Sequence, residues 1–302
     1  MSAGANSLKS ILYALAANFS IAIAKSIASI ITGSSAMLAE AIHSFADTGN
    51  QLLLLLGLKQ AKRPPTPEHP LGYGKAIFFW SFIVALMLFS MGGLFSVYEG
   101  VHKLEASEPL TMPWLAVGVL MFSIVAEGLS LFGAITEINK VRGTRSLWHW
   151  FRESRQSELI VVFGEDIAAL VGLSLALVAV LLTIITGNLM FDALGSIAIG
   201  VVLLFVAVGV GVEVKALLIG QSAEPVVQQA IRDFVNAHDE VTSVFNLITL
   251  QMGDRLMVSI KARMREDENA KLLLDDINRV EEAIRARFPQ IQWLFFEPDS
   301  RY

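Results

Sequence analysis

The chain of 302 residues contains no cysteine. This absence excludes disulfide scaffolds, zinc–thiolate sites, iron–sulfur clusters and cysteine nucleophiles. Histidine occurs five times, so any metal site built on imidazole is small or includes oxygen ligands. Charged residues make up 17% of the chain, against about 25% in a typical soluble domain. The net charge of −5 argues against nucleic acid as a partner.

Hydrophobic residues, in contrast, make up 54% of the chain. This excess excludes an ordinary cytosolic globule, because long apolar stretches need lipid to cover them. Charges are sparse before residue 214 and dense after residue 221. We therefore expect a membrane-embedded, all-α six-helix transmembrane bundle over residues 1–214 and a C-terminal α+β cytoplasmic domain over residues 215–302. The six stretches, each near the roughly 20 residues that cross a bilayer, are 12–31, 36–58, 76–97, 114–136, 159–185 and 191–212.

Basic residues are concentrated in the linkers that follow the second and fourth apolar stretches. They are Lys59, Lys62, Arg63, Lys75, Lys140, Arg142, Arg145, Arg152 and Arg155. The linkers on the opposite side contribute Lys103. Because loops rich in lysine and arginine stay in the cytoplasm, we expect both termini to be cytoplasmic. The sequence thus predicts a multi-pass protein in the lipid bilayer of a bacterial inner membrane.

The tail has the pattern of a small αββαβ domain. Residues 225–237 and 273–288 have apolar residues at helical spacing, and residues 256–264 alternate between apolar and polar. Residues 241–251 and 291–296 are rich in β-branched and aromatic residues, which favours two more strands. Gly253 and Asp254, between the first two strands, suit a hairpin turn. We expect a small sheet with its helices on one face.

Polar residues interrupt the second apolar stretch. His43 and Asp47 are four residues apart and Asn50 follows, so a helix places all three on one face. An imidazole and a carboxylate in this arrangement can both reach one divalent cation. The alternative is an interhelical hydrogen bond, which we weight lower because ionisable groups inside a membrane mark function. Glu40 lies nearer the helix end and on a different face, so we expect it to be solvated there.

The fifth apolar stretch contains two adjacent carboxylates, Glu165 and Asp166. Carboxylates inside a membrane are unfavourable unless a cation or protons compensate them. With the second stretch, they supply enough ligands to close a four-coordinate shell. Adjacent residues on a helix point about 100° apart, however, so one can bind the metal while the other carries a proton.

Several motifs together resemble the cation diffusion facilitator family. Residues 33–47 look like its second-helix signature and residues 69–75 like its first cytoplasmic loop. Residues 98–104 are similar to the end of its third helix, residues 192–196 to the start of its sixth, and the αββαβ tail to its cytoplasmic domain. The pattern His-Ser-x-x-Asp-x-x-Asn-Gln, with Glu-Asp in the fifth stretch, resembles the zinc-transporter-9-like branch.

The resemblance implies a homodimeric antiporter that exports Zn²⁺, or a similar divalent metal, in exchange for protons. Such a protein is a carrier rather than an enzyme, and the metal is its substrate rather than a cofactor. In the family, two residues four apart on the second helix and two on the fifth hold the metal. These positions are His43, Asp47, Val162 and Asp166. Valine cannot ligate, so Glu165 or Asn50 is expected to fill that place.

The resemblance also implies accessory sites, which look eroded. His69 is the one histidine left in the first loop, with Tyr73 where the family has another histidine, and His238 in the tail falls in a turn. We therefore expect the tail to hold the dimer by packing. Lys75 resembles the loop lysine that pairs across the dimer with an acid, here Glu213; alternatively both are solvated.

Other interpretations stay open. One imidazole with several oxygens suits Zn²⁺ but also Mn²⁺, Fe²⁺, Co²⁺ or Cd²⁺. A passive metal channel would use similar ligands, and the loss at Val162 is compatible with a non-transporting metal-binding receptor or scaffold. Lys25 and Glu127, two further charges in apolar stretches, are given no transport role. The aromatic and basic residues of 145–155 predict an amphipathic segment on the membrane surface.

Overall fold

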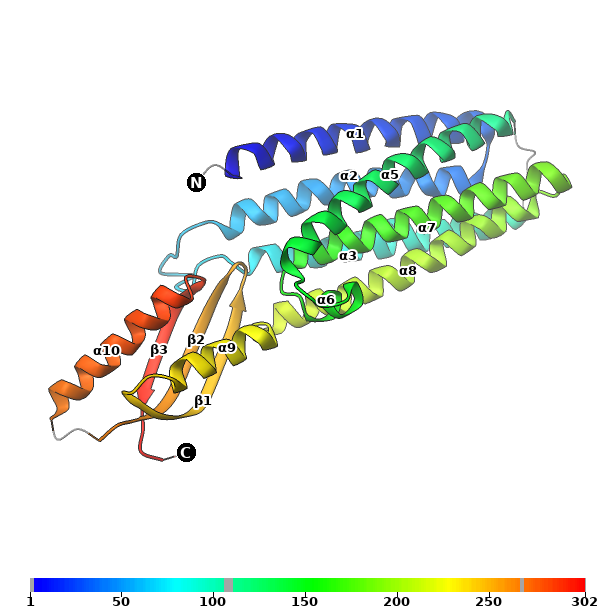
Figure 1. Cartoon of the computed structure of the whole chain (residues 1–302). Coiled ribbons are helices and arrows are strands. Elements are labelled where there is room, and N and C mark those ends of the chain that lie inside the picture. The colour runs from blue at the N-terminus through cyan, green and yellow to red at the C-terminus, as the bar shows by residue number, and fades with distance from the viewer. Residues whose placement is uncertain (1–2, 106–110, 267–268, 302) are drawn as a thin grey trace. The chain divides into compact units, whose positions relative to one another are not determined.

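The computed structural model describes residues 3–105, 111–266 and 269–301 (Figure 1). The elements in chain order are α1 (Ala3–Thr32), α2 (Ser35–Ala61), α3 (Ala76–Met87), the π-helical η1 (Leu88–Leu94), α4 (Phe95–Glu105), α5 (Pro113–Val141), α6 (Leu147–Glu153), α7 (Ser157–Thr186), α8 (Met190–Ile219), α9 (Pro225–Asn236), β1 (Val241–Met252), β2 (Arg255–Met264), α10 (Ala270–Arg287) and β3 (Ile291–Pro298).

The chain forms two compact units. The first consists of Met1–Gly57, Phe79–Arg145 and Glu158–Val214, and is helical. The second consists of Leu58–Phe78, Ser146–Ser157 and Lys215–Tyr302. The segments 58–78 and 146–157, which the sequence analysis placed with residues 1–214, therefore group with the tail. Each unit has its own buried apolar cluster.

Within the described residues, four helical stretches are long and apolar enough to cross a membrane. They are Ala76–Glu105, which joins α3, η1 and α4, together with α5, α7 and α8. In α1, the apolar part is Asn18–Thr32, which is shorter than these four stretches. α2 is not among the four; polar residues, among them Glu40, His43 and Asp47, interrupt its apolar sequence. Six membrane-spanning helices were expected from the sequence, and four of them are long and apolar enough by this test.

The stretch from α3 to α4 departs from the expected helix in two ways. It continues to Glu105 rather than ending near residue 97, because Glu99, His102 and Lys103 are helical although they are not apolar. It also contains the π-helical turn of η1, a form that is rare and often found at functional sites. Hydropathy alone reports neither feature.

The tail has the element order α9-β1-β2-α10-β3. β1 pairs antiparallel with β2, and β2 pairs parallel with β3 (Figure 1). Met252 and Arg255 face each other across the turn, where Gly253 has a φ of 70°, a left-handed conformation that glycine adopts readily. The core lies between the sheet and the two helices. It includes Ile231, Val258, Ile260, Val280 and Ile284, all fully buried.

Segments 58–78 and 146–157 contact the tail inside the second unit. The Arg155 side chain donates from Nε to the carbonyl of Ser222 at 2.7 Å. The backbone of Gly74 lies against the Met252–Gly253 turn so closely that a side chain there would clash with the Met252 carbonyl. In α6, Trp150 is buried while Trp148 is 70% exposed, so the helix is two-sided. A position on a membrane surface for this segment stays a prediction.

Candidate metal-transport site

α2 places His43, Asp47 and Asn50 on one face by helical spacing. Nε2 of His43 lies 3.6 Å from Oδ2 of Asp47, one turn further along the helix. His43 and Asn50 have no exposed surface, and Asp47 is 9% exposed. The predicted imidazole–carboxylate pair is therefore present and lies in a buried environment.

Several polar atoms on this helix have no hydrogen-bond partner among the described residues. They are Oε1 of Glu40, both ring nitrogens of His43, Oδ1 of Asp47, Oδ1 of Asn50 and Oε1 of Gln51. A buried polar atom without a partner costs about 1–3 kcal/mol. A bound cation would satisfy the oxygens of Asp47 and Asn50 and one ring nitrogen of His43, because a neutral imidazole has a free lone pair on one nitrogen and a hydrogen on the other.

α7 supplies the two adjacent carboxylates, which point to different helices. Asn50 donates from Nδ2 to Oε1 of Glu165 at 2.5 Å, which joins α7 to α2. The hydroxyl of Ser130, on α5, lies 3.3 Å and 3.4 Å from the two carboxylate oxygens of Asp166. The angle of about 100° between neighbouring helix positions explains this divergence. Glu165 is thus the carboxylate that contacts α2.

Four carboxylates gather around this part of the first unit. Asp47 interacts electrostatically with Glu165, Glu127 and Asp166, and also with the ammonium group of Lys25. Glu127 of α5 is 7% exposed and also interacts with Asp166. The sequence analysis assigned Glu127 no transport role, yet the structure brings it near enough to interact electrostatically with Asp47 and Asp166. So much negative charge in an apolar environment favours a cation or protons.

The candidate ligand side chains do not converge on a single metal position in this structure. Among the described residues, no group of three or more histidine, aspartate or glutamate side chains lies close enough to hold one metal ion. The structure brings together two pairs instead, His43 with Asp47 and Asn50 with Glu165. Val162 is half-buried on α7, one turn before Asp166, and offers no ligand. Side chains must move for a shell of three or four protein ligands to close.

Glu40 is not solvated at a helix end, so that expectation was wrong. Its side chain has no exposed surface, and its Oε2 lies 3.3 Å from Nζ of Lys25 on α1. Lys25 is equally buried and donates to the hydroxyl of Ser44 at 2.7 Å. The partner comes from another helix, and the spacing of residues along α2 could not reveal it.

Residues 11–219 match the cation efflux transmembrane domain. The chain belongs to the cation efflux family.

Among its relatives is the mitochondrial proton-coupled zinc antiporter SLC30A9 of Xenopus laevis, which is 33% identical over 272 residues. This alignment covers 86% of the present chain and 48% of the relative. Metal tolerance protein C4 of Arabidopsis thaliana is 31% identical over 217 residues, 71% of this chain and 48% of the relative. The cation-efflux pump FieF of Cronobacter sakazakii is 29% identical over 269 residues, 85% and 81% of the two chains. The present chain spans about half the length of the zinc antiporters it matches.

The accessory histidines of this cation efflux protein make ordinary contacts. The rings of His69 and Tyr73 stack with their centroids 4.4 Å apart. His238 follows α9, where Nδ1 lies 2.8 Å from the carbonyl oxygen of Phe234. The first contact is typical of packing within a loop, and the second is typical of a turn that follows a helix. The proposed roles of His69, and of Lys75 with Glu213, stay predictions.

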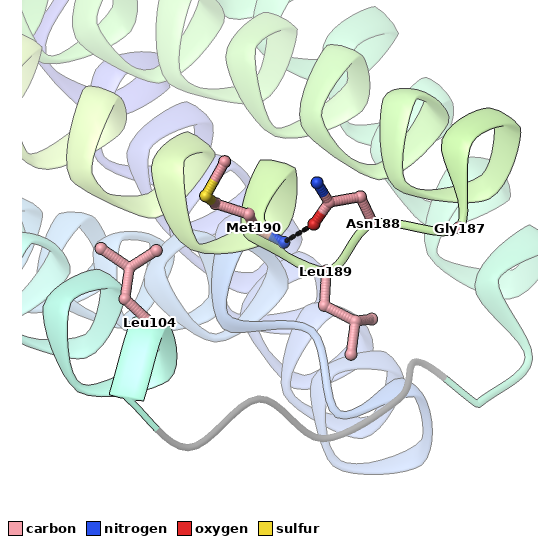
Figure 2. A pocket seen from close by; sticks show the side chains of 5 residues that line it. All are labelled: Leu104, Gly187, Asn188, Leu189 and Met190. Atoms are coloured by element: carbon pink, nitrogen blue, oxygen red, sulfur yellow. Dashed lines mark hydrogen bonds between the residues drawn. The ribbon is translucent and has the colours of Figure 1, made fainter.

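A pocket of about 440 Å³ lies where α7 connects to α8 (Figure 2). It is lined by Leu104, Gly187, Asn188, Leu189 and Met190. Figure 2 shows the Asn188 side chain turned back to its own chain, where Oδ1 accepts a hydrogen bond from the Met190 backbone at 3.0 Å. None of the five lining side chains is ionisable, so the pocket supplies no strong ligand for a divalent cation.

Sequence reasoning missed Ser130 and Gly172. Ser130 lies three residues after Glu127 and so shares its face of α5, a signal that could have been read from the spacing. Gly172 is one of several glycines in apolar helices. Its position against Glu40 depends on how α7 packs on α2.

Proposed function

We propose that the chain exports a divalent metal in exchange for protons, and that Zn²⁺ is the favoured substrate. Membership of the cation efflux family and the names of the zinc-antiporter relatives support this proposal. The observation that carries it is the buried pair of His43 and Asp47, whose ring nitrogens and Oδ1 lack partners among the described residues. One imidazole with several carboxylate oxygens suits Zn²⁺, and Mn²⁺, Fe²⁺, Co²⁺ and Cd²⁺ are alternative substrates of the same mechanism.

In the proposed cycle the protein alternates between access to the cytoplasm and access to the other side. His43, Asp47 and Asp166 bind the metal in their deprotonated forms, because ligation requires free lone pairs. Glu165 or Asn50 completes the shell in place of Val162. Protons from the opposite side then displace the metal. No covalent intermediate is involved.

We propose that α1 and α2 also cross the membrane, which makes six spans over residues 1–214. The polar groups of α2 are compatible with a span because they are buried inside the first unit. Residues 215–302 then form the cytoplasmic αββαβ domain, with both termini in the cytoplasm of a bacterial inner-membrane protein. Two copies form a homodimer in which the tails pack together, and Lys75 and Glu213 contribute to that contact.

Zinc flux into proteoliposomes tests the proposal. An imposed pH gradient should drive Zn²⁺ against its own gradient, and collapse of the pH gradient should stop that uphill movement. A passive channel would instead continue to equilibrate Zn²⁺ after the collapse. The same vesicles, challenged with a panel of Mn²⁺, Fe²⁺, Co²⁺ and Cd²⁺, identify the substrate.

A second candidate is a membrane metal receptor or scaffold that does not transport. Val162 at the expected fourth ligand position and the absence of a group of three converged ligands among the described residues favour it. Purified protein that binds Zn²⁺ but moves none of the panel metals across the vesicle would support this candidate over the exporter.

A further inference from the structure

A buried ion pair joins α1 to α2 beside the proposed transport site. Nζ of Lys25 lies 3.3 Å from Oε2 of Glu40 and 2.7 Å from the hydroxyl of Ser44. Neither charged side chain has exposed surface. The other oxygen of Glu40, Oε1, has no hydrogen-bond partner among the described residues. The pair is therefore anchored on the lysine side and less restrained on the carboxylate side.

α7 is shaped to accept this carboxylate. A methyl group added at Gly172 would lie 2.6 Å from Oε1 of Glu40, closer than real contacts allow. Glycine therefore leaves the space that the Glu40 side chain occupies. Three helices, α1, α2 and α7, thus contribute to one buried arrangement.

A buried ion pair is a weak means of stabilising a fold. Removing two charges from water costs several kcal/mol per ion, and hydrophobic replacements are often as stable. Charged residues within membrane segments usually face functional pathways. A contribution to stability therefore explains Lys25 and Glu40 poorly. A role in separating the proposed metal site from one end of the helices explains them better.

The pair lies between the proposed ligands and the end of the unit that contains the α1–α2 connection. Glu40 precedes His43 by three residues, about 4.5 Å along the helix toward that connection. One to two turns further, Ser34 and Ser35 donate to the carboxylate of Asp192 at the start of α8, with side-chain distances of 2.5 Å and 2.9 Å. Two polar layers thus join the helices on this side of the site.

The side chains around the ion pair are almost fully enclosed. The side chains of Lys25, Glu40 and His43 have no exposed surface, whereas that of Asp47 is 13% exposed. The structure is thus closed from His43 toward the α1–α2 connection, and Asn50, about one turn beyond Asp47, is fully buried as well.

We propose that the Lys25–Glu40 ion pair is a gate that closes the metal site toward the α1–α2 end of the helices. The gate rests on the proposed transport site at His43 and Asp47. While the pair is formed, α1 is held against α2, and the lysine ammonium repels a divalent cation that would leave in this direction. Separation of Lys25 from Glu40 opens the path. Under the proposed topology this is the non-cytoplasmic side.

Cysteine labelling tests the gate, since the chain contains no native cysteine. His43→Cys places a reporter thiol at the site, and labelling by a membrane-impermeant thiol reagent is measured without metal from each side of a proteoliposome. Lys25→Met and Glu40→Gln break the pair, and Gly172→Ala displaces Glu40 without changing a charge. Ser26→Ala is the matched control, because this neighbour of Lys25 bonds its hydroxyl to the Ala22 carbonyl of its own helix.

A separate Asn188→Cys protein identifies the α1–α2 side of the vesicle. Asn188 is exposed in the α7–α8 connection, four residues from the Asp192 that binds Ser34 and Ser35. A reagent that labels this thiol is on the side that the gate faces.

The gate predicts slow labelling of the reporter from that side in the parent and in Ser26→Ala. Each of the three pair-breaking variants should label at least about tenfold faster from the same side, the factor equivalent to about 1.4 kcal/mol. Rates equal to the Ser26→Ala control would overturn the gate. An equal increase from both sides would also overturn it, because that result indicates a loosened bundle instead.

The labelling experiment does not depend on transport. It uses neither metal nor a pH gradient, so the gate can fail while zinc–proton exchange is measured normally in the native chain. Conversely, a chain that moves no metal can still show gated access to residue 43, which would separate failure of the proposed function from failure of the gate.

Discussion

Asn50 on α2 donates a hydrogen bond of 2.5 Å to Glu165 on α7, 115 residues away in the chain. Both side chains are buried, and the amide oxygen of Asn50, Oδ1, has no hydrogen-bond partner among the described residues. The two candidates for the place left by Val162 are therefore in contact with each other. In the proposed site they act as one unit: the amide positions the carboxylate, or both contribute an oxygen to the metal.

Glu165→Gln should weaken Zn²⁺ binding by at least about tenfold, since it removes an anionic donor from a site with few ligands. Asn50→Ala should weaken it to a similar extent, because the carboxylate loses its anchor. The double variant should be little worse than either single one, because effects within one interacting pair are not additive. Binding isotherms of the three proteins, with Asp166→Asn for comparison, measure this. Strictly additive losses would show that the two residues act independently.

His43→Asn should weaken metal binding and flatten the pH dependence of transport between about pH 6 and 8. The prediction applies where His43 itself carries the exchanged proton, because an imidazole in water has a pKa of about 6.5. Initial rates of zinc flux at a series of pH values compare the variant with the parent. A profile that keeps its shape would assign the exchanged proton to one of the carboxylates.

Val162→His should shift metal preference toward Zn²⁺. The new imidazole would stand one turn before Asp166 and give the site a second nitrogen ligand, which tetrahedral zinc sites accept well and Mn²⁺ favours less. The ratio of Zn²⁺ to Mn²⁺ affinity should increase by about tenfold. Val162→Leu is the control for altered packing, and a ratio that changes equally in both variants would contradict the prediction.

Asp192→Asn should destabilise the first unit by about 1–3 kcal/mol, because a buried acceptor of three hydrogen bonds from Ser34 and Ser35 loses its charge and part of its accepting capacity. Thermal unfolding of the full chain in detergent measures the loss. Ser174→Ala, which removes an exposed hydroxyl bonded within its own helix, serves as the control and should leave the unfolding midpoint almost unchanged.

Much of the fold follows from local patterns. α7 and α8 are recognised by continuous hydropathy, and β2 by the alternation of buried Val258 and Ile260 with more accessible neighbours. The pairing of His43 with Asp47 follows from helical spacing alone. These features need no knowledge of which helix packs on which.

Contacts between helices could not be predicted in the same way. Glu40 was expected in solvent because its partner, Lys25, belongs to a different helix, and Gly172 acquires meaning through the packing of α7 on Glu40. The opposite directions of Glu165 and Asp166 follow from helix geometry, but their partners Asn50 and Ser130 do not. The spacing of residues predicts which side chains share one face of a helix. The candidate site also depends on which other helices pack against that face.

Asp47→Ala tests the central claim most directly. The variant should remain folded, as judged by size-exclusion chromatography and by the thermal midpoint. Oδ1 of Asp47 has no hydrogen-bond partner among the described residues, and its Oδ2 lies 3.6 Å from His43, so the substitution removes little that holds the fold. In proteoliposomes with an imposed pH gradient, the parent chain should drive Zn²⁺ uptake with matching proton movement. The variant should show no flux above that of protein-free vesicles. Zinc uptake by the folded variant at the rate of the parent would contradict the assignment of the transport site to this face of α2.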